Sequence, residues 1–127
     1  MDGFLTGRLN SNNLIEIYKL TIVGNPEIIQ GLISITERAD NVYMHLIESA
    51  PYNLGRNKVY IGVPGNLVAF ACRIAFHRGF DGYVSFTSKT MLIDHYQKSL
   101  GAFNVGGNLM VINTDSALKL IDKYFKK

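Results

Sequence analysis

The spacing of apolar and polar positions divides the chain into two parts, and the first part favours strands. Three segments, Leu14–Val23, Ile28–Glu37 and Asn41–Ser49, are rich in β-branched and aromatic residues that polar residues interrupt. Gly24-Asn25-Pro26 and Arg38-Ala39-Asp40 separate these segments and are typical of turns. The short second connection predicts an antiparallel hairpin.

In the second part, helices and strands alternate. Apolar residues recur with a helical period from Pro64 to Arg78, and Gly79 is suited to end that helix. Cys72, inside this helix, is expected in the core. The further elements predicted are a strand over Gly82–Phe86, a helix from Thr87 or Ser88 to Leu100, a strand over Leu109–Ile112, and a final helix from Thr114 or Asp115 to Tyr124, with Leu118, Ile121 and Phe125 on one apolar face.

This order of elements predicts one α/β domain. Antiparallel strands followed by alternating strands and helices are typical of a mixed layered sheet protein. Residues 1–13 are polar and rich in Gly, Asn and Ser, so we expect a loose lead-in there and the folded domain over residues 14–127. A length of 127 residues also fits a single domain.

Composition and charge exclude some classes of protein. Hydrophobic residues make up 47% of the chain and charged residues 18%, which favours a globular protein over a disordered one. The net charge of +3 suits an anionic small molecule as well as a nucleic acid. The basic residues are scattered, however, and no aromatic-basic recognition motif is present, so a nucleic-acid module is not favoured.

The single cysteine excludes an internal disulfide and fits a reducing compartment. No Cys/His cluster has metal-ligand spacing, so no metal is expected. No apolar stretch reaches signal-peptide character at the start or the roughly 20 residues of a membrane span. We therefore expect a soluble, cytoplasmic protein without a membrane partner.

The most suggestive local feature is the junction Gly62-Val63-Pro64-Gly65, where a strand over Val59–Ile61 leads into the first helix. A helix entered through glycines exposes several backbone N–H groups at its positive end, which favours a polyanion. A plain strand-to-helix turn uses glycine for its geometry alone. The residues of this junction fit both an anion-binding helix start and a plain turn.

The segment Gly62–Gly101 resembles the core of the GNAT (N-acetyltransferase) superfamily, in which a loop of pattern Q/R-x-x-G-x-G/A opens a helix. Gly62 matches the first glycine of that loop, and Gly79 matches the helix end. The strand GYVSF follows, and Tyr96 and Gly101 in HYQKSLG match a tyrosine-glycine signature. Over residues 14–113, the resemblance implies a mixed, largely antiparallel central sheet flanked by helices.

The resemblance implies acetyl-CoA as co-substrate, with its pyrophosphate at the start of the helix. The strand end over residues 46–49 would lie along the pantetheine and bond it like an added strand. Arg56 and Lys58 in the preceding loop would pair with phosphate. The implied binding residues are Leu46, Ile47, Ser49, Arg56, Lys58, Ile61, Gly62, Val63, Gly65 and Asn66.

The resemblance further implies direct transfer of the acetyl group to a primary amine. Tyr96 would be the general acid for the CoA sulfur, and Glu48, at the end of a strand, would be the general base. A core tyrosine and a rim carboxylate are the structural alternatives for these two residues. His45, His77 and His95 are expected to have structural roles.

A second function stays open, that of a catalytically inactive GNAT-fold module for binding or assembly. Val59 and Pro64 replace the Gln or Arg and the Gly or Ala of the family pattern, and the first 13 residues are too few for the family's two early helices. Glu48, Tyr96 and Gly62 favour the enzyme instead. Because a sheet without those helices is partly uncovered, we expect a homodimer.

Overall fold

Seven strands form one sheet in the order β1-β2-β3-β4-β5-β7-β6. The computed structural model describes residues 4–8, 14–50 and 62–125. All neighbouring strands are antiparallel except β4 and β5, which are parallel. The strands are β1 (Phe4–Arg8), β2 (Glu16–Ile22), β3 (Asn25–Glu37), β4 (Val42–Ser49), β5 (Val84–Thr87), β6 (Phe103–Gly106) and β7 (Leu109–Ile112). This architecture confirms the predicted mixed, largely antiparallel α/β fold.

The predicted antiparallel arrangement of β2, β3 and β4 is confirmed. Strand β3 begins at Asn25, earlier than expected, so only Gly24 of the Gly-Asn-Pro turn signal stays in the turn. Alternate side chains of these strands point to the same face, where Leu20, Ile33 and Ile35 are almost completely buried.

Two strands differ from the prediction, and both lie at an edge of the sheet. Residues 1–13 were expected to be a loose lead-in, but Phe4–Arg8 pair with β2 as β1. Phe103–Gly106 pair with β7 as β6, and all four residues of β6 are exposed. Edge strands with little apolar burial carry no alternating pattern, because pairing with a neighbour, and not a buried face, forms them.

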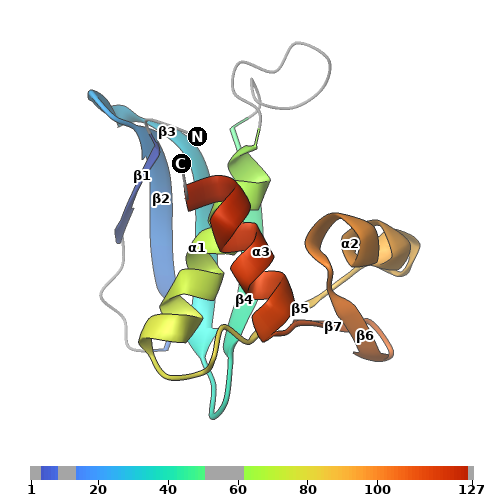
Figure 1. Cartoon of the computed structure of the whole chain (residues 1–127). Coiled ribbons are helices and arrows are strands. Elements are labelled where there is room, and N and C mark those ends of the chain that lie inside the picture. The colour runs from blue at the N-terminus through green and yellow to red at the C-terminus, as the bar shows by residue number, and fades with distance from the viewer. Residues whose placement is uncertain (1–3, 9–13, 51–61, 126–127) are drawn as a thin grey trace.

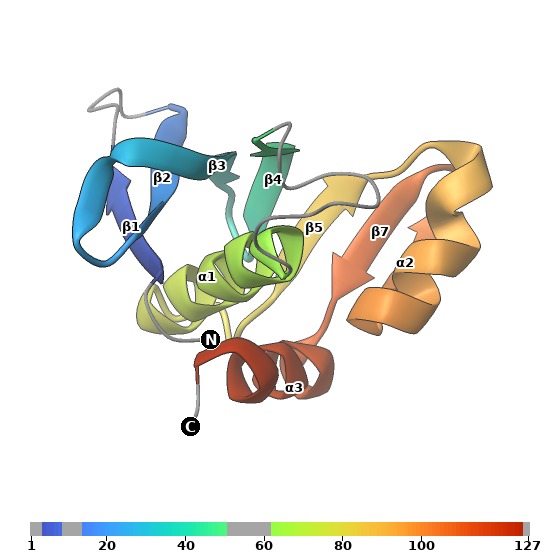
Figure 2. The same ribbon diagram turned by 90° about the horizontal axis from the view of Figure 1, so that it is seen from above.

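One face of the sheet is covered by α1 (Val63–His77) and α3 (Thr114–Phe125), and α2 (Ile93–Leu100) lies beside its β6–β7 end (Figures 1 and 2). The predicted ends of α1 and α2, at Gly79 and Gly101, are confirmed. The start of the second helix was predicted too early. Thr87 still belongs to β5, and the short 3-10 helix η2 (Thr90–Leu92) precedes α2.

The helical period of α1 predicts a buried stripe of Leu67, Phe70, Ala71, Ile74 and Ala75. All of these are buried except Phe70, which is half-buried and packs its ring against Tyr18. Burial raises the pKa of the Cys72 thiol to about 12, in agreement with its expected place in the core. On α3 the prediction was wrong for Leu118, which is 52% exposed. Helix α3 packs on α1, so its buried face is centred on Ala117 and Leu120.

A charged network ties the end of α1 to the sheet. Arg78, directly after α1, donates two hydrogen bonds to the Glu16 carboxylate of β2 at 2.6 and 2.7 Å. It also bonds Glu37 of β3 at 3.2 Å, and the Tyr18 hydroxyl donates to Glu16 at 2.6 Å. The Arg78 guanidinium lowers the pKa of Glu16 to about 2, although burial acts in the opposite direction.

No described helix covers the opposite face of the sheet. Leu46 and Phe103 are 54% and 52% exposed on this side. The expected homodimer stays a prediction that these uncovered apolar side chains motivate. No helix in the described part of the chain is long and apolar enough to cross a membrane.

We expect Glu16→Gln to lower the free energy of unfolding near neutral pH by about 2 kcal/mol, because Arg78 loses the charge that compensates its partial burial. The folded pKa of Glu16 lies below its ordinary 4.5, so the carboxylate stabilises the fold above that pH. The stabilisation is lost as the pH falls from 4.5 towards 2. Urea unfolding at several pH values measures both effects.

The control is Glu37→Gln. Glu37 is the outer partner of Arg78, and the Glu37 side chain is 51% exposed. This change should alter stability only slightly, since exposed ion pairs contribute little. An acid dependence of stability that is the same in the parent and in Glu16→Gln would contradict the assignment.

Candidate active site

Strands β4 and β5 are paired over three residues only, and then they separate (Figure 2). The last pair is Met44 with Phe86, and the Tyr43 hydroxyl is 2.7 Å from the Thr87 hydroxyl beside it. At the same level β4 contains a bulge. Ser34 and Ile35 of β3 face Leu46 and Met44, so His45 between them has no partner in the register. A bulge bends its strand, which fits the divergence of β4 from β5.

Beyond Met44, one edge of β4 therefore has no neighbouring strand among the described residues. Along a strand, backbone N–H and C=O groups alternate between the two edges. The side towards β3 is paired as far as Ser49, and the side towards β5 is open. An extended ligand with amide groups can bond to such an edge in the manner of an added strand.

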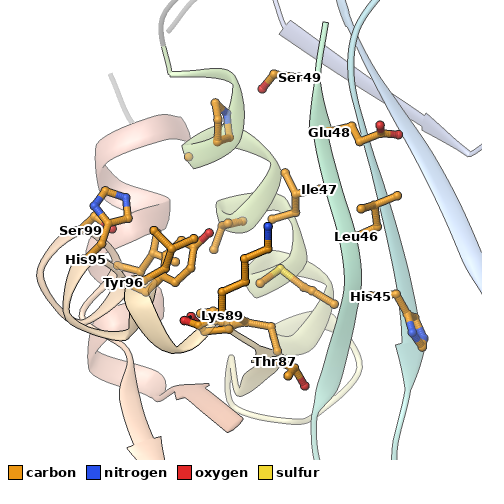
Figure 3. Close-up of a pocket in the computed structure, with 18 of the residues that line it drawn as sticks. His45, Leu46, Ile47, Glu48, Ser49, Thr87, Lys89, His95, Tyr96 and Ser99 are labelled. Carbon is orange, nitrogen blue, oxygen red and sulfur yellow. The ribbon is translucent and has the colours of Figure 1, made fainter. Parts of the chain in front are cut away.

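A cavity of about 910 Å³ lies where the two strands have separated (Figure 3). Its walls come from β4, the residues after β5, α2, the first turn of α1 and the end of α3. Figure 3 shows Ile47 directed towards the α1 side, and His45, Leu46 and Glu48 directed towards the open side of the sheet. The cavity is thus lined by residues from both faces of the sheet.

The first turn of α1 meets the cavity at Pro64 and Gly65. Gly62 precedes the helix in a left-handed conformation, with φ 83°, which disfavours any side chain. The Asn66 backbone N–H donates to the Gly62 carbonyl at 2.9 Å, whereas the N–H groups of Val63 and Gly65 precede the helical ladder. No acidic residue lies in this turn, so its positive end is not neutralised there.

A hydroxyl group marks the same end of the cavity. The Ser49 Oγ is buried and has no hydrogen-bond partner among the described residues. Figure 3 places Ser49 at the end of β4, near the start of α1. A buried hydroxyl without a partner costs about 1–3 kcal/mol, so a polar ligand group here would be favoured.

Gly65 allows close contact between α1 and α3. A Cβ atom at this position would overlap the Tyr124 ring, including its hydroxyl. Tyr124 also lines the cavity, and Lys123 lies with its ammonium 5.3 Å from the centre of that ring. The absence of a side chain at Gly65 therefore lets the end of α3 form part of the cavity wall.

Tyr96 is the central polar group of the α2 wall. Its ring packs edge-on against Phe86, with the ring centres 5.3 Å apart, and Figure 3 shows its hydroxyl directed into the cavity. The hydroxyl has no hydrogen bond to a described residue. Gly101 ends α2 and donates its backbone N–H to the Tyr96 carbonyl, which anchors this residue at the helix end. The ring is thus held by packing, and the hydroxyl stays available to a ligand.

Glu48 lies at the rim on the opposite side of β4. Its side chain is exposed and, in Figure 3, points away from Tyr96 towards the open side of the sheet. An acid and a base arranged in this way would approach a ligand from two sides. The same position fits a rim carboxylate.

The structure brings six of the sequence-predicted residues to one cavity: Leu46, Ile47, Glu48, Ser49, Gly65 and Tyr96. The side chains of Val63 and Asn66 instead point into the protein, where both are buried, and the Asn66 amide donates to Gly62 at 3.4 Å. Arg56, Lys58 and Ile61 lie outside the described residues.

Sequence reasoning missed several lining residues, among them Thr87, Lys89 and Tyr124. No local motif distinguishes them, because their common location follows from tertiary packing. Two of the histidines for which structural roles were expected, His45 and His95, line the cavity. His45 is exposed at the bulge and bonds the Thr36 hydroxyl, and the His95 ring lies 5.2 Å from the Tyr96 ring. Within the described residues, no three His, Cys, Asp or Glu side chains gather as metal ligands would.

Comparison with known proteins identifies the fold. No family model and no curated protein matches the chain. Among solved structures, AtaTR bound with AcCoA is similar at a TM-score of 0.68 and 15% identity, over 95% of this chain and 99% of that chain. The KacTA–DNA complex is similar at a TM-score of 0.63 and 15% identity, over 89% of this chain and 76% of that chain.

Tetrahymena GCN5 is similar at a TM-score of 0.54 and 12% identity, over 81% of this chain and 71% of that chain. At such identities, the likeness concerns the fold. The chain has the GNAT fold, which confirms the resemblance that its sequence suggests.

We expect Gly65→Ala to destabilise the fold by about 1–3 kcal/mol, because the new methyl group overlaps the Tyr124 ring. In a Tyr124→Ala background the same change should cost much less, because the ring is gone. Thermal or urea unfolding of the four proteins of this double-mutant cycle measures the coupling. Equal costs in the two backgrounds would exclude the contact.

Proposed function

We propose that this GNAT-fold chain is an acetyl-CoA-dependent N-acetyltransferase that transfers the acetyl group directly to a primary amine. The observation that carries the proposal is the single cavity that joins the free edge of β4, the start of α1 and the Tyr96 hydroxyl. Two similar structures, of AtaTR and of AtaT Y144F with AtaR, contain acetyl-CoA, which supports this choice of co-substrate.

The pyrophosphate of acetyl-CoA would lie at the first turn of α1. The free N–H groups of Val63 and Gly65 and the helix dipole favour an anion there. Arg56 and Lys58, outside the described residues, would add charge pairing. Pro64 contributes no N–H group, so this turn offers one donor fewer than a glycine or alanine would give.

The pantetheine would extend along Leu46–Ser49, whose open edge can bond its amide groups. This path leads from the start of α1 towards the level of Ile47 and Tyr96. The thioester would then lie near the Tyr96 hydroxyl and within reach of the open side of the sheet. Val68 and Phe86 make this part of the cavity wall apolar.

In the proposed reaction, Glu48 takes a proton from the acceptor ammonium, directly or through a water molecule. The neutral amine attacks the thioester carbonyl, the C–N bond forms, the nitrogen loses its second proton to water, and the C–S bond breaks. The Tyr96 hydroxyl gives its proton to the leaving thiolate and regains one from solvent. The acceptor would enter from the open side of the sheet, where Glu48 lies, because α1 and α3 cover the other side.

The alternative, an inactive binding or assembly module, keeps one specific argument in the missing N–H of Pro64. Such a module would have lost either acetyl-CoA binding or turnover. Binding and turnover are therefore tested separately below.

We expect calorimetric titration to detect acetyl-CoA binding, and Gly62→Ala to weaken it strongly by straining the start of α1. Gly79→Ala is the matched control, because Gly79 has nearly the same φ, 84° against 83°, at the other end of α1. Both changes should reduce stability by about 1 kcal/mol, but only the first should affect binding. Absence of heat and of a thermal shift at roughly millimolar acetyl-CoA would overturn the enzyme proposal.

We expect Tyr96→Phe to reduce turnover by roughly 10²–10⁴-fold with little change in stability or in acetyl-CoA affinity, because the ring packing is kept and only the hydroxyl is lost. Release of CoA thiol, first to water and then to a set of primary amines, measures the rate. Tyr83→Phe, at an exposed tyrosine outside the cavity, is the control. Unchanged thiol release in Tyr96→Phe would favour the binding module.

A further inference from the structure

Lys89 occupies the cavity in a way that the proposed transfer reaction does not use. It follows β5 at the point where β5 and β4 have separated, and its side chain lines the cavity. In Figure 3 the Lys89 side chain extends into the space between Ile47 of β4 and Tyr96 of α2. An amine is thus placed inside the same cavity where a thioester would bind.

The backbone at the base of this side chain is held firmly. Asn108 bonds the main chain of Ser88 twice, through its carbonyl at 2.8 Å and its side-chain amide at 2.7 Å. The Lys89 carbonyl accepts the Leu92 N–H at 2.9 Å and the Ser88 hydroxyl at 2.7 Å. Because both sides of this residue are fixed, the amine can move only within the reach of its own side chain.

No carboxylate of a described residue holds the ammonium elsewhere. The ion pairs found in the described part of the chain join Arg8 and Arg78 to Glu16 and Glu37, and none includes Lys89. Glu48 is the one acidic residue in the described cavity wall, and Figure 3 shows it directed to the other side of β4. The amine of Lys89 is therefore free to contact a ligand.

We propose that Lys89 is an internal acetyl acceptor, so that the chain acetylates itself at this residue when acetyl-CoA fills the cavity. This inference rests on the proposed acetyl-CoA binding. The neutral Nζ attacks the thioester carbonyl carbon, the C–N bond forms and the C–S bond breaks. The amine proton goes to water, and the thiolate takes the Tyr96 proton or one from solvent. The products are Nε-acetyllysine and CoA, and no further reactant is needed.

The modification changes the cavity in two ways. It removes the positive charge of Lys89, and it leaves a neutral amide with an added methyl group between Ile47 and Tyr96. Both effects act on the part of the cavity that the thioester would enter. Self-acetylation therefore weakens the binding of the next acetyl-CoA molecule, which makes Lys89 a regulatory site.

The test is incubation of the full chain with acetyl-CoA, followed by intact-mass and peptide mass spectrometry. We expect addition of one acetyl group, at Lys89, at least ~100-fold faster than at Lys119 of α3, because the cavity holds amine and thioester together. The fraction modified per unit time should not change with protein concentration, as for a reaction within one chain.

Lys89→Arg should abolish the modification, and because Lys89 is exposed the change should not disturb the core. Lys119→Arg, at an exposed lysine outside this cavity, is the matched control and should leave the modification unchanged. The chain unfolded in urea should show no preference for Lys89 over other lysines. A preference that survives unfolding would contradict the inference.

Titration with acetyl-CoA separates the two proposals. Binding of acetyl-CoA without acetylation at Lys89 overturns this inference and leaves the proposed function intact. Acetylation that accelerates with protein concentration, or that falls equally on many lysines, also overturns it. No binding at all overturns both.

Discussion

The separation of β4 from β5 in the middle of the sheet is the constraint on which the rest of the structure depends. Backbone N–H and C=O groups in a sheet need partners, and an open edge between two central strands is costly unless water or a ligand supplies them. Here the pairing ends at Met44 and Phe86, directly before the bulge at His45. The sheet therefore keeps an edge for another extended molecule, and the neighbouring elements can only line that gap.

A gap of this kind is useful only if the elements around it are fixed, and the fixing contacts lie away from it. Arg78 ties the far end of α1 to Glu16 and Glu37, so the first turn of the helix is held at the cavity from the opposite end. Gly65 then lets α3 pack closely on that first turn. The end of α1 at Arg78 thus contributes stability, and the first turn at Gly65 lines the cavity. A mutation at one end need not impair the other.

The sequence predicts the elements that bury a face and fails for those that do not. Strands β2, β3 and β4 follow from their β-branched and aromatic content between turn signals, and the buried face of α1 follows from its helical period. Strand β6 exposes every side chain, and β1, inside a polar stretch, also had no apolar alternation to reveal it. Leu118 shows the related error of assigning an apolar residue to the core before the partner of the helix is known. At the site, the glycine junction at Gly62 was found from the residues themselves and Tyr96 through a family resemblance. Lys89 and Tyr124 reach the cavity through packing between distant segments, which no local pattern encodes.

The proposed transfer and the proposed self-acetylation use one thioester, so they compete for the same acetyl group. Lys89 approaches from the side of Ile47 and Tyr96, whereas an external amine would approach past Glu48 from the open side of the sheet. The internal amine is always present at high effective concentration, but only the external one has a carboxylate beside its path to take its proton. A bound acceptor would therefore capture the acetyl group first, and Lys89 would receive it when no acceptor is bound. The fraction of Lys89 that is acetylated would then depend on how long the protein has held acetyl-CoA without an acceptor.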